Sequence, residues 1–170
     1  MNMRRNIFWG FTVIAAALIQ TTWLETIQVQ QVQPDLTLLL VVYFAIADGE
    51  ERAMLTGLLG GLYQDVTSNS VLGHHVLSLV VVGYVVGRMS TRLITEHPAI
   101  KAGVVFVGAL LHGLVYTLVL FVMKPHISAF DIIAKSVVPG AFYTAILTPV
   151  VFLFLTWSFH RTDLWARGAA

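Results

Sequence analysis

Long apolar stretches, separated by short clusters of charged residues, are the feature that most restricts the fold of this chain. Of its 170 residues, 57% are hydrophobic and only 11% are charged. A soluble domain carries about 25% charged residues, so this chain lacks the polar side chains to cover a water-facing surface. It contains no cysteine, which excludes disulfides, thiolate metal sites and thiol catalysis. The composition therefore predicts a small polytopic membrane protein.

Six of these stretches are candidate membrane-spanning segments, at residues 7–24, 36–47, 53–66, 71–87, 102–123 and 136–159. Backbone N–H and C=O groups in hydrocarbon must be paired within the segment, so we expect α-helices. The second and third stretches are short for a bilayer crossing. We still expect two crossings, because a re-entrant hairpin would place the charged residues of 48–52 near the bilayer centre. The sequence thus predicts one all-α transmembrane domain over residues 1–170 with six transmembrane helices.

Basic residues are distributed unequally between the two sides of this arrangement. If the N-terminus is cytoplasmic, Lys124 and Lys135 lie outside, and the other basic residues lie inside: Arg4, Arg5, Arg52, Arg88, Arg92, Lys101, Arg161 and Arg167. This asymmetry indicates that both termini are cytoplasmic. We interpret the first stretch as an uncleaved helix, because five further apolar stretches follow it. The formal net charge of +1 offers no basic field for nucleic acid.

Small residues repeat at helical spacing in the third and fourth stretches. Gly57, Gly61 and Asp65 are each four residues apart and share one helix face. Small residues allow another helix to approach closely in a membrane. We expect Gly57 and Gly61 to pack the third and fourth helices together, because a tight connection joins them. Gly83 and Gly87 form a second small-residue face, which packs against the third helix or contacts a partner.

Acidic residues stand at two predicted helix ends. Pro34 and Asp35 open the second helix, where proline suits the first turn and aspartate suits the cap. Asp65 lies at the outer end of the third helix, where it is either a functional group or a ligand of the following turn's backbone. His74 and His75 begin the next helix, but adjacent histidines point in different directions and disfavour a shared metal ion. We predict no catalytic residue, metal site or cofactor.

Proton or ion transport would require polar groups across the whole membrane. His112 and Tyr116, on one face of the fifth helix, are the later candidates for such a chain of groups. We find no buried acid in the cytoplasmic half of that route, so the sequence disfavours transport.

The chain resembles the family of the bacterial rod shape-determining protein MreD. The resemblance rests on Pro34-Asp35, on LTLLLVVYFAIADGEERAMLTGLLGGLYQDV at 36–66, which contains the G-x-x-x-G-x-x-x-D motif, and on SNSVLGHHVLS at 68–78 with its Gly73. It implies a non-enzymatic scaffold subunit of the cell-elongation and peptidoglycan-synthesis complex in the bacterial cytoplasmic membrane. The implied partners are MreC, the RodA glycosyltransferase with its penicillin-binding transpeptidase, and the MreB filament.

The same resemblance implies a fold similar to the S components of energy-coupling-factor transporters. The alternative function is therefore binding of a vitamin as such an S component. The usual docking pattern of S components, two alanines four residues apart in the first helix, is missing, since Ala15, Ala16 and Ala17 are consecutive. This departure counts against the alternative.

For the scaffold function, we expect a groove on the membrane-embedded surface to hold the transmembrane helix of MreC. Gly83 and Gly87 would set the approach distance of that helix. The outer rim around Pro34, Asp35 and Asp65 would position the juxtamembrane segment of MreC.

Overall fold

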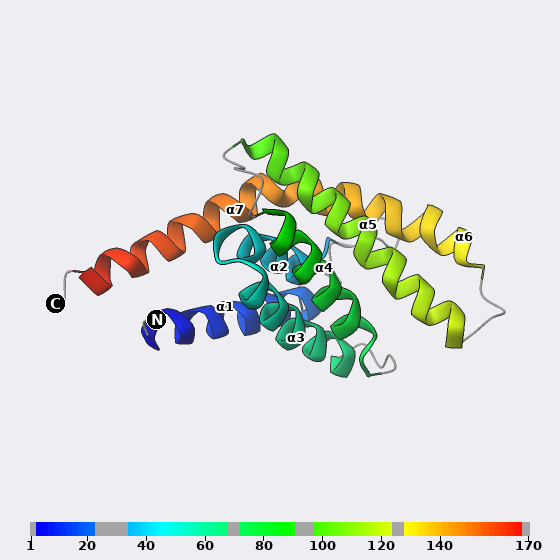
Figure 1. Ribbon diagram of the computed structural model, residues 1–170, viewed down its shortest axis with the longest axis horizontal. Helices are drawn as coiled ribbons and strands as arrows, with labels where there is room; N and C mark the ends of the chain where they lie inside the picture. Colours follow the sequence, from blue (N-terminus) through cyan, green and yellow to red (C-terminus); the bar gives the residue numbers. More distant parts are fainter. Residues whose placement is uncertain (1–2, 23–33, 68–71, 91–96, 124–127, 168–170) are drawn as a thin grey trace.

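A computed structural model describes residues 3–22, 34–67, 72–90, 97–123 and 128–167, and helices account for nearly all of them (Figure 1). The helices are α1 (Met3–Thr22), α2 (Leu36–Ala47), α3 (Glu50–Thr67), α4 (His74–Ser90), α5 (Pro98–Met123), α6 (Ala129–Ile132), the π-helical segment η2 (Ile133–Val137) and α7 (Val138–Arg167). No strand occurs in these ranges. The all-helical prediction is therefore confirmed for the described part of the chain.

Each predicted stretch overlaps a helix. The second stretch coincides with α2, whereas the sixth lies within a longer helical run, because α6, η2 and α7 follow one another without a break from Ala129. By length and composition, α5 and the run Ala129–Phe159 can each cross a membrane, and shorter apolar helices cover Asn6–Gln20 and Leu36–Ala47. Six membrane crossings remain a prediction.

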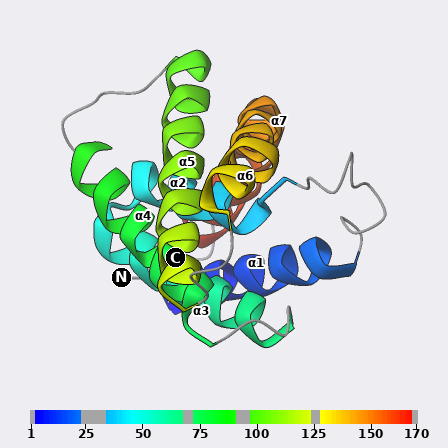
Figure 2. The same ribbon diagram turned by 90° about the vertical axis from the view of Figure 1, so that its right-hand side faces the viewer.

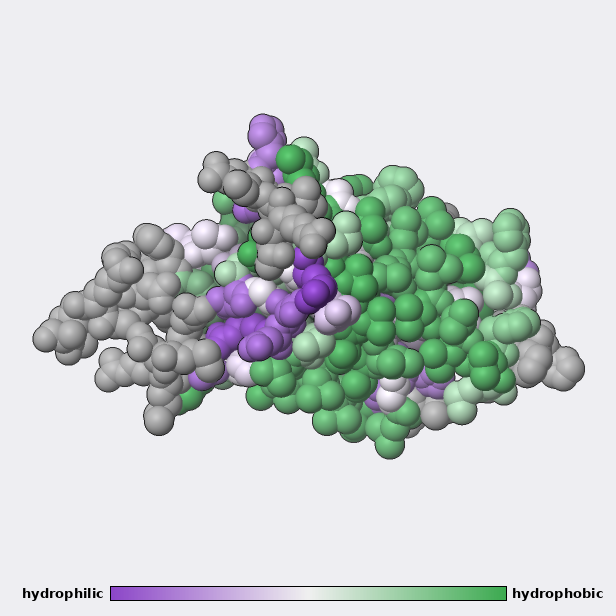
Figure 3. Space-filling model, in the orientation of Figure 1, coloured by the Kyte–Doolittle hydropathy of each residue, from purple (hydrophilic) through white to green (hydrophobic). Residues whose placement is uncertain are grey.

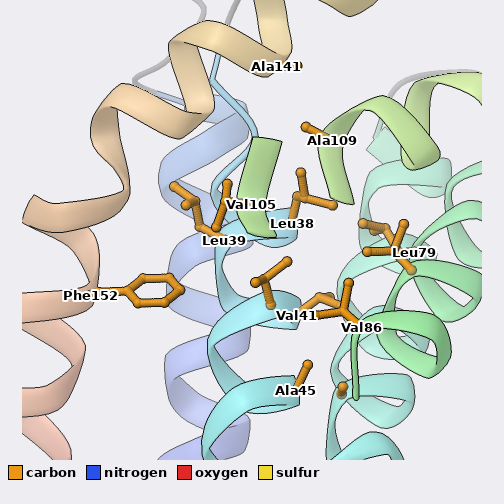
Figure 4. Packing of buried hydrophobic residues seen from close by; sticks show 13 residues of the cluster. Leu38, Leu39, Val41, Ala45, Leu79, Val86, Val105, Ala109, Ala141 and Phe152 are labelled. Atoms are coloured by element: carbon orange, nitrogen blue, oxygen red, sulfur yellow. The ribbon is translucent and has the colours of Figure 1, made fainter. Parts of the chain in front are cut away.

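The short helix α2 lies at the centre of the bundle and contacts α1, α3, α4, α5 and α7 (Figure 2). It is apolar around its whole circumference, which is typical of a helix enclosed by others. Its side chains form the core with residues of α4, α5 and α7, including Leu79, Val105 and Phe152 (Figure 4). Because protein encloses α2, its length need not match the thickness of a bilayer.

Large apolar side chains also cover much of the outer surface of the bundle. In Figure 3 they fill most of the visible face, while hydrophilic side chains gather toward the end where α1 begins and α7 ends. Ile7, Phe11, Ile14 and Leu18 form an exposed stripe on α1, at the spacing of one helix face. Exposed apolar stripes of this kind are typical of helices that face lipid.

Polar residues concentrate at the two ends of the bundle. At the first end, which we call the Arg52 end, Arg52 donates to Asn6 Oδ1, lies 3.8 Å from Asp48 Oδ2 and stacks over the ring of Trp9. The rings of Phe8 and Phe159 lie 5.0 Å apart, so the start of α1 and the last part of α7 share this end. The opposite end, the Asp35 end, holds the candidate site.

Candidate functional site

Asp35 is the N-cap of α2 and connects α2 to neighbouring helices. Its Oδ1 accepts a hydrogen bond from the backbone N of Leu38 at 2.9 Å, as the capping preference predicts. The same oxygen accepts from Nε2 of Gln20 in α1 and from Nε2 of Gln64 in α3, both at 3.3 Å. One carboxylate oxygen therefore joins three helices.

The other groups of Asp35 face α5 and α7. Its backbone N donates to Thr144 Oγ1 at 3.2 Å, and its Oδ2 lies 3.8 Å from Nδ1 of His112. Gln20 extends the network, since its Oε1 accepts from both the backbone N and the hydroxyl of Thr37 at 3.0 and 2.9 Å. The Asp35 network thus draws α1, α2, α3, α5 and α7 together at one end.

A cavity of about 500 Å³ opens beside this network. Helices α1 to α5 and the α6–η2–α7 run all contribute to its wall. The π-helical segment η2 supplies Ser136 and Val137, and π-helical turns often occur at functional sites. The lining residues are Gln20, Pro34, Asp35, Leu38, Gln64, Thr67, His75, Ala109, His112, Gly113, Tyr116, Ile132, Ser136, Val137, Gly140, Ala141 and Thr144.

Asp65 caps α4 from outside that helix. Its carboxylate accepts from the backbone N of Gly73 at 2.8 Å, of His75 at 3.0 Å and of Val76 at 3.3 Å, and its Oδ1 lies 2.9 Å from Nδ1 of His75. The first turn of a helix leaves N–H groups without helical partners, and Asp65 satisfies them. Its side chain is fully buried. Asp65 therefore fixes the start of α4 against α3.

Two histidines and a tyrosine continue from Asp65 toward Asp35. The rings of His75 and Tyr116 lie 4.9 Å apart, and those of His75 and His112 lie 6.2 Å apart. His112 then faces Asp35, so one wall of the cavity connects both acids. Within the described ranges, no group of three or more His, Asp or Glu residues is placed to hold a metal ion.

The glycines of α3 and α4 lie inside one interface. A Cβ atom at Gly57 would lie 2.9 Å from the backbone of Leu79, and one at Gly61 would lie 2.7 Å from the backbone of Val76. This is the close helix packing that the four-residue spacing predicts. Gly83 and Gly87 approach α3 in the same way, with a Cβ atom at 2.9 Å from Ala53 and 2.5 Å from Glu50.

Comparison with known families identifies the chain. The family model of the rod shape-determining protein MreD matches residues 3–158. The chain belongs to the MreD family. MreD proteins are membrane proteins that take part in determining rod shape. No curated protein and no solved structure matches the chain, so the expected likeness of MreD to S components has no support.

The positions of Gly83 and Gly87 correct our expectation for this MreD protein. We expected both glycines to set the approach distance of a partner helix, but α3 of the same chain occupies that face. Helical spacing shows which residues share a face without showing which neighbour the face meets. Of the three residues that we expected at the outer rim, Asp65 is instead buried and bonded to α4, whereas Pro34 and Asp35 line the cavity.

Sequence reasoning missed most of the polar residues that surround Asp35. Gln64 and Thr144 had no assigned role, and Gln20 was one of several polar residues late in the first predicted span. The available signal was an amide or hydroxyl within an apolar helix, since such a group must find a partner when buried. The π-helical segment η2 had no sequence signal that we can name.

Replacement of Gln20 with leucine should destabilise this MreD protein by about 1–3 kcal/mol. The backbone N–H and the hydroxyl of buried Thr37 would lose their shared acceptor, and Asp35 would lose one donor. Thermal unfolding in mild detergent measures the change. Ile19→Leu, at an exposed apolar neighbour, is the matched control and should unfold like the wild type. Equal unfolding midpoints for Gln20→Leu and Ile19→Leu would contradict the assigned network.

Proposed function

We propose that this chain is a non-enzymatic membrane scaffold that binds MreC and helps connect it to RodA, the penicillin-binding transpeptidase and MreB. The match to the rod shape-determining protein MreD over residues 3–158 is the observation that carries the proposal. The helices offer an apolar outer surface for contacts within the membrane, as the exposed stripe of α1 illustrates. A scaffold of this kind acts through its surface and makes or breaks no covalent bond.

The arrangement in the membrane is part of the proposal. Six crossings in a single transmembrane domain would place the Arg52 end and both termini at the cytoplasmic side of the bacterial inner membrane. The excess of Lys and Arg in the predicted cytoplasmic segments supports this orientation. The contact between Phe8 and Phe159 supports a common side for the beginning of α1 and the last part of α7.

The Asp35 end would then face the outer side of the membrane, where the juxtamembrane segment of MreC leaves the bilayer. Pro34 and Asp35 lie in the wall of the cavity at that end. The cavity gathers residues from all eight described helical elements, so an occupant would touch most of the bundle at once. We therefore place the extracytoplasmic part of the MreC contact at this cavity.

Affinity purification tests the proposal. The tagged chain, extracted in mild detergent from cells that produce MreC at its native level, should retain MreC through size-exclusion chromatography. A helical membrane protein of similar size with the same tag is the control. If MreC separates from the tagged chain while the chain itself stays folded and monodisperse, the proposed function is wrong.

A further inference from the structure

The cavity at the Asp35 end has an unbalanced charge. Among the described residues that line it, Asp35 is the only acid and none is Lys or Arg. The side chain of Asp35 is 19% exposed, so this carboxylate is partly withdrawn from solvent. A charge in such a site interacts more strongly with an opposite charge than it would in water. The wall therefore favours an occupant that carries a positive charge.

The carboxylate also has an oxygen available for an occupant. Oδ1 of Asp35 already accepts three N–H groups, from Leu38, Gln20 and Gln64. Within the described residues, Oδ2 accepts no hydrogen bond, and Nδ1 of His112 lies 3.8 Å from it, which is too distant for one. His112 Nε2 is buried and has no hydrogen-bond partner in the same part of the chain. Such incompletely satisfied groups in a polar cavity indicate a binding site.

The remaining wall suits a long side chain with an apolar stem. Leu38, Ile132 and Val137 supply apolar surface beside the polar groups. Lys and Arg pack their methylene groups against such surface while the charged end makes polar contacts. A volume of about 500 Å³ also leaves space for residues on either side of the basic one.

We propose that this cavity accepts a Lys or Arg side chain from the MreC segment adjacent to its transmembrane helix, with the ammonium or guanidinium group bound to Oδ2 of Asp35. Both groups are donors without an acceptor, which matches the free carboxylate oxygen. This inference rests on the proposed function and adds the chemistry of recognition to it. The contact fixes the depth and register of MreC against the bundle.

Removal of the charge at Asp35 and narrowing of the cavity test the inference, with retention of MreC as the measurement. Asp35→Asn removes the charge but keeps a residue that caps helices well, and it should lower the retained MreC about tenfold because the basic group loses its partner. Asp131→Asn, at an exposed acid of α6 that is not in the cavity wall, is the matched control and should retain MreC like the wild type. Ser136→Trp narrows the cavity at an exposed position and should also lower retention.

The rescue identifies the source of the cation. Asp35→Lys should abolish retention, and a Lys→Glu or Arg→Glu change in the juxtamembrane segment of MreC should restore it. If Lys124→Glu restored MreC retention to the Asp35→Lys variant, the inference would be wrong, because the cation that pairs with residue 35 would then belong to this chain and not to MreC. Lys124 lies outside the described residues. Wild-type retention by both Asp35→Asn and Ser136→Trp would overturn it too, while leaving the proposed function intact. Loss of MreC from the wild-type chain would overturn both this inference and the proposed function.

Discussion

Substitution of Gly61 by alanine should destabilise the bundle by about 3 kcal/mol, at the upper end of the usual cost of overpacking. The added Cβ atom would lie 2.7 Å from the backbone N and Cα of Val76. A flexible side chain could rotate away from such a contact, but a helix backbone cannot. Helices α3 and α4 would have to separate along an interface that also contains Gly57, Gly83 and Gly87. We expect a lower unfolding midpoint in detergent and less folded protein in the membrane.

Gly103→Ala in α5 is the matched control for this experiment. An added Cβ atom there meets nothing within 4 Å, so the change should leave stability equal or slightly higher because alanine favours helix. An unfolding midpoint of Gly61→Ala as high as that of Gly103→Ala would show that α3 and α4 do not pack closely at Gly61.

Replacement of Asp65 by alanine should cost about 2–4 kcal/mol, because several backbone N–H groups would lose their acceptor at once. Gly73, His75 and Val76 all donate to its carboxylate, and the ring of His75 would lose its partner. We expect the start of α4 to fray. Hydrogen exchange of residues 72–78, followed by mass spectrometry in detergent, should show faster exchange there than at the core of α2.

Asp131→Ala provides the comparison for Asp65→Ala. Asp131 is exposed and pairs with Lys135 at 2.9 Å, and an exposed ion pair contributes little to stability. The same variants separate the two interpretations of Asp65. A direct contact with MreC predicts loss of MreC at unchanged stability, whereas the capping role predicts loss of stability first.

Helix positions could be predicted where local chemistry decides them. Asp35 starts α2 as its N-cap, as predicted, whereas Pro34 precedes the cap and lies outside the first turn where we expected it. The Asp48-Gly49 turn ends α2, with Gly49 at a φ of 89° that favours glycine. The start of the sixth helical run could not be predicted from hydropathy. Asp131 and Lys135 ended the apolar run in the sequence, but they form an i,i+4 ion pair on the exposed side of a continuing helix.

The candidate site depends on contacts that are distant in the sequence. Asp35 bonds to Gln20, Gln64 and Thr144, and the bond to Thr144 spans 109 residues. The cap of α2 was predictable because Asp35 and Leu38 are close in the chain. Which helices surround that cap depends on tertiary packing, which the pattern of a single helix does not contain.

Cross-linking in growing cells tests most directly whether this MreD protein acts by binding MreC. A photoreactive phenylalanine derivative at Tyr116 would replace an aromatic ring that already lies in the cavity wall, and the same group at Ile146 of α7 would lie on the exposed apolar surface away from that wall. We predict an MreC adduct at Tyr116, with the attachment site in the juxtamembrane segment of MreC, and a much weaker adduct at Ile146. The absence of an MreC adduct from both positions, in cells that keep their rod shape, would contradict the account.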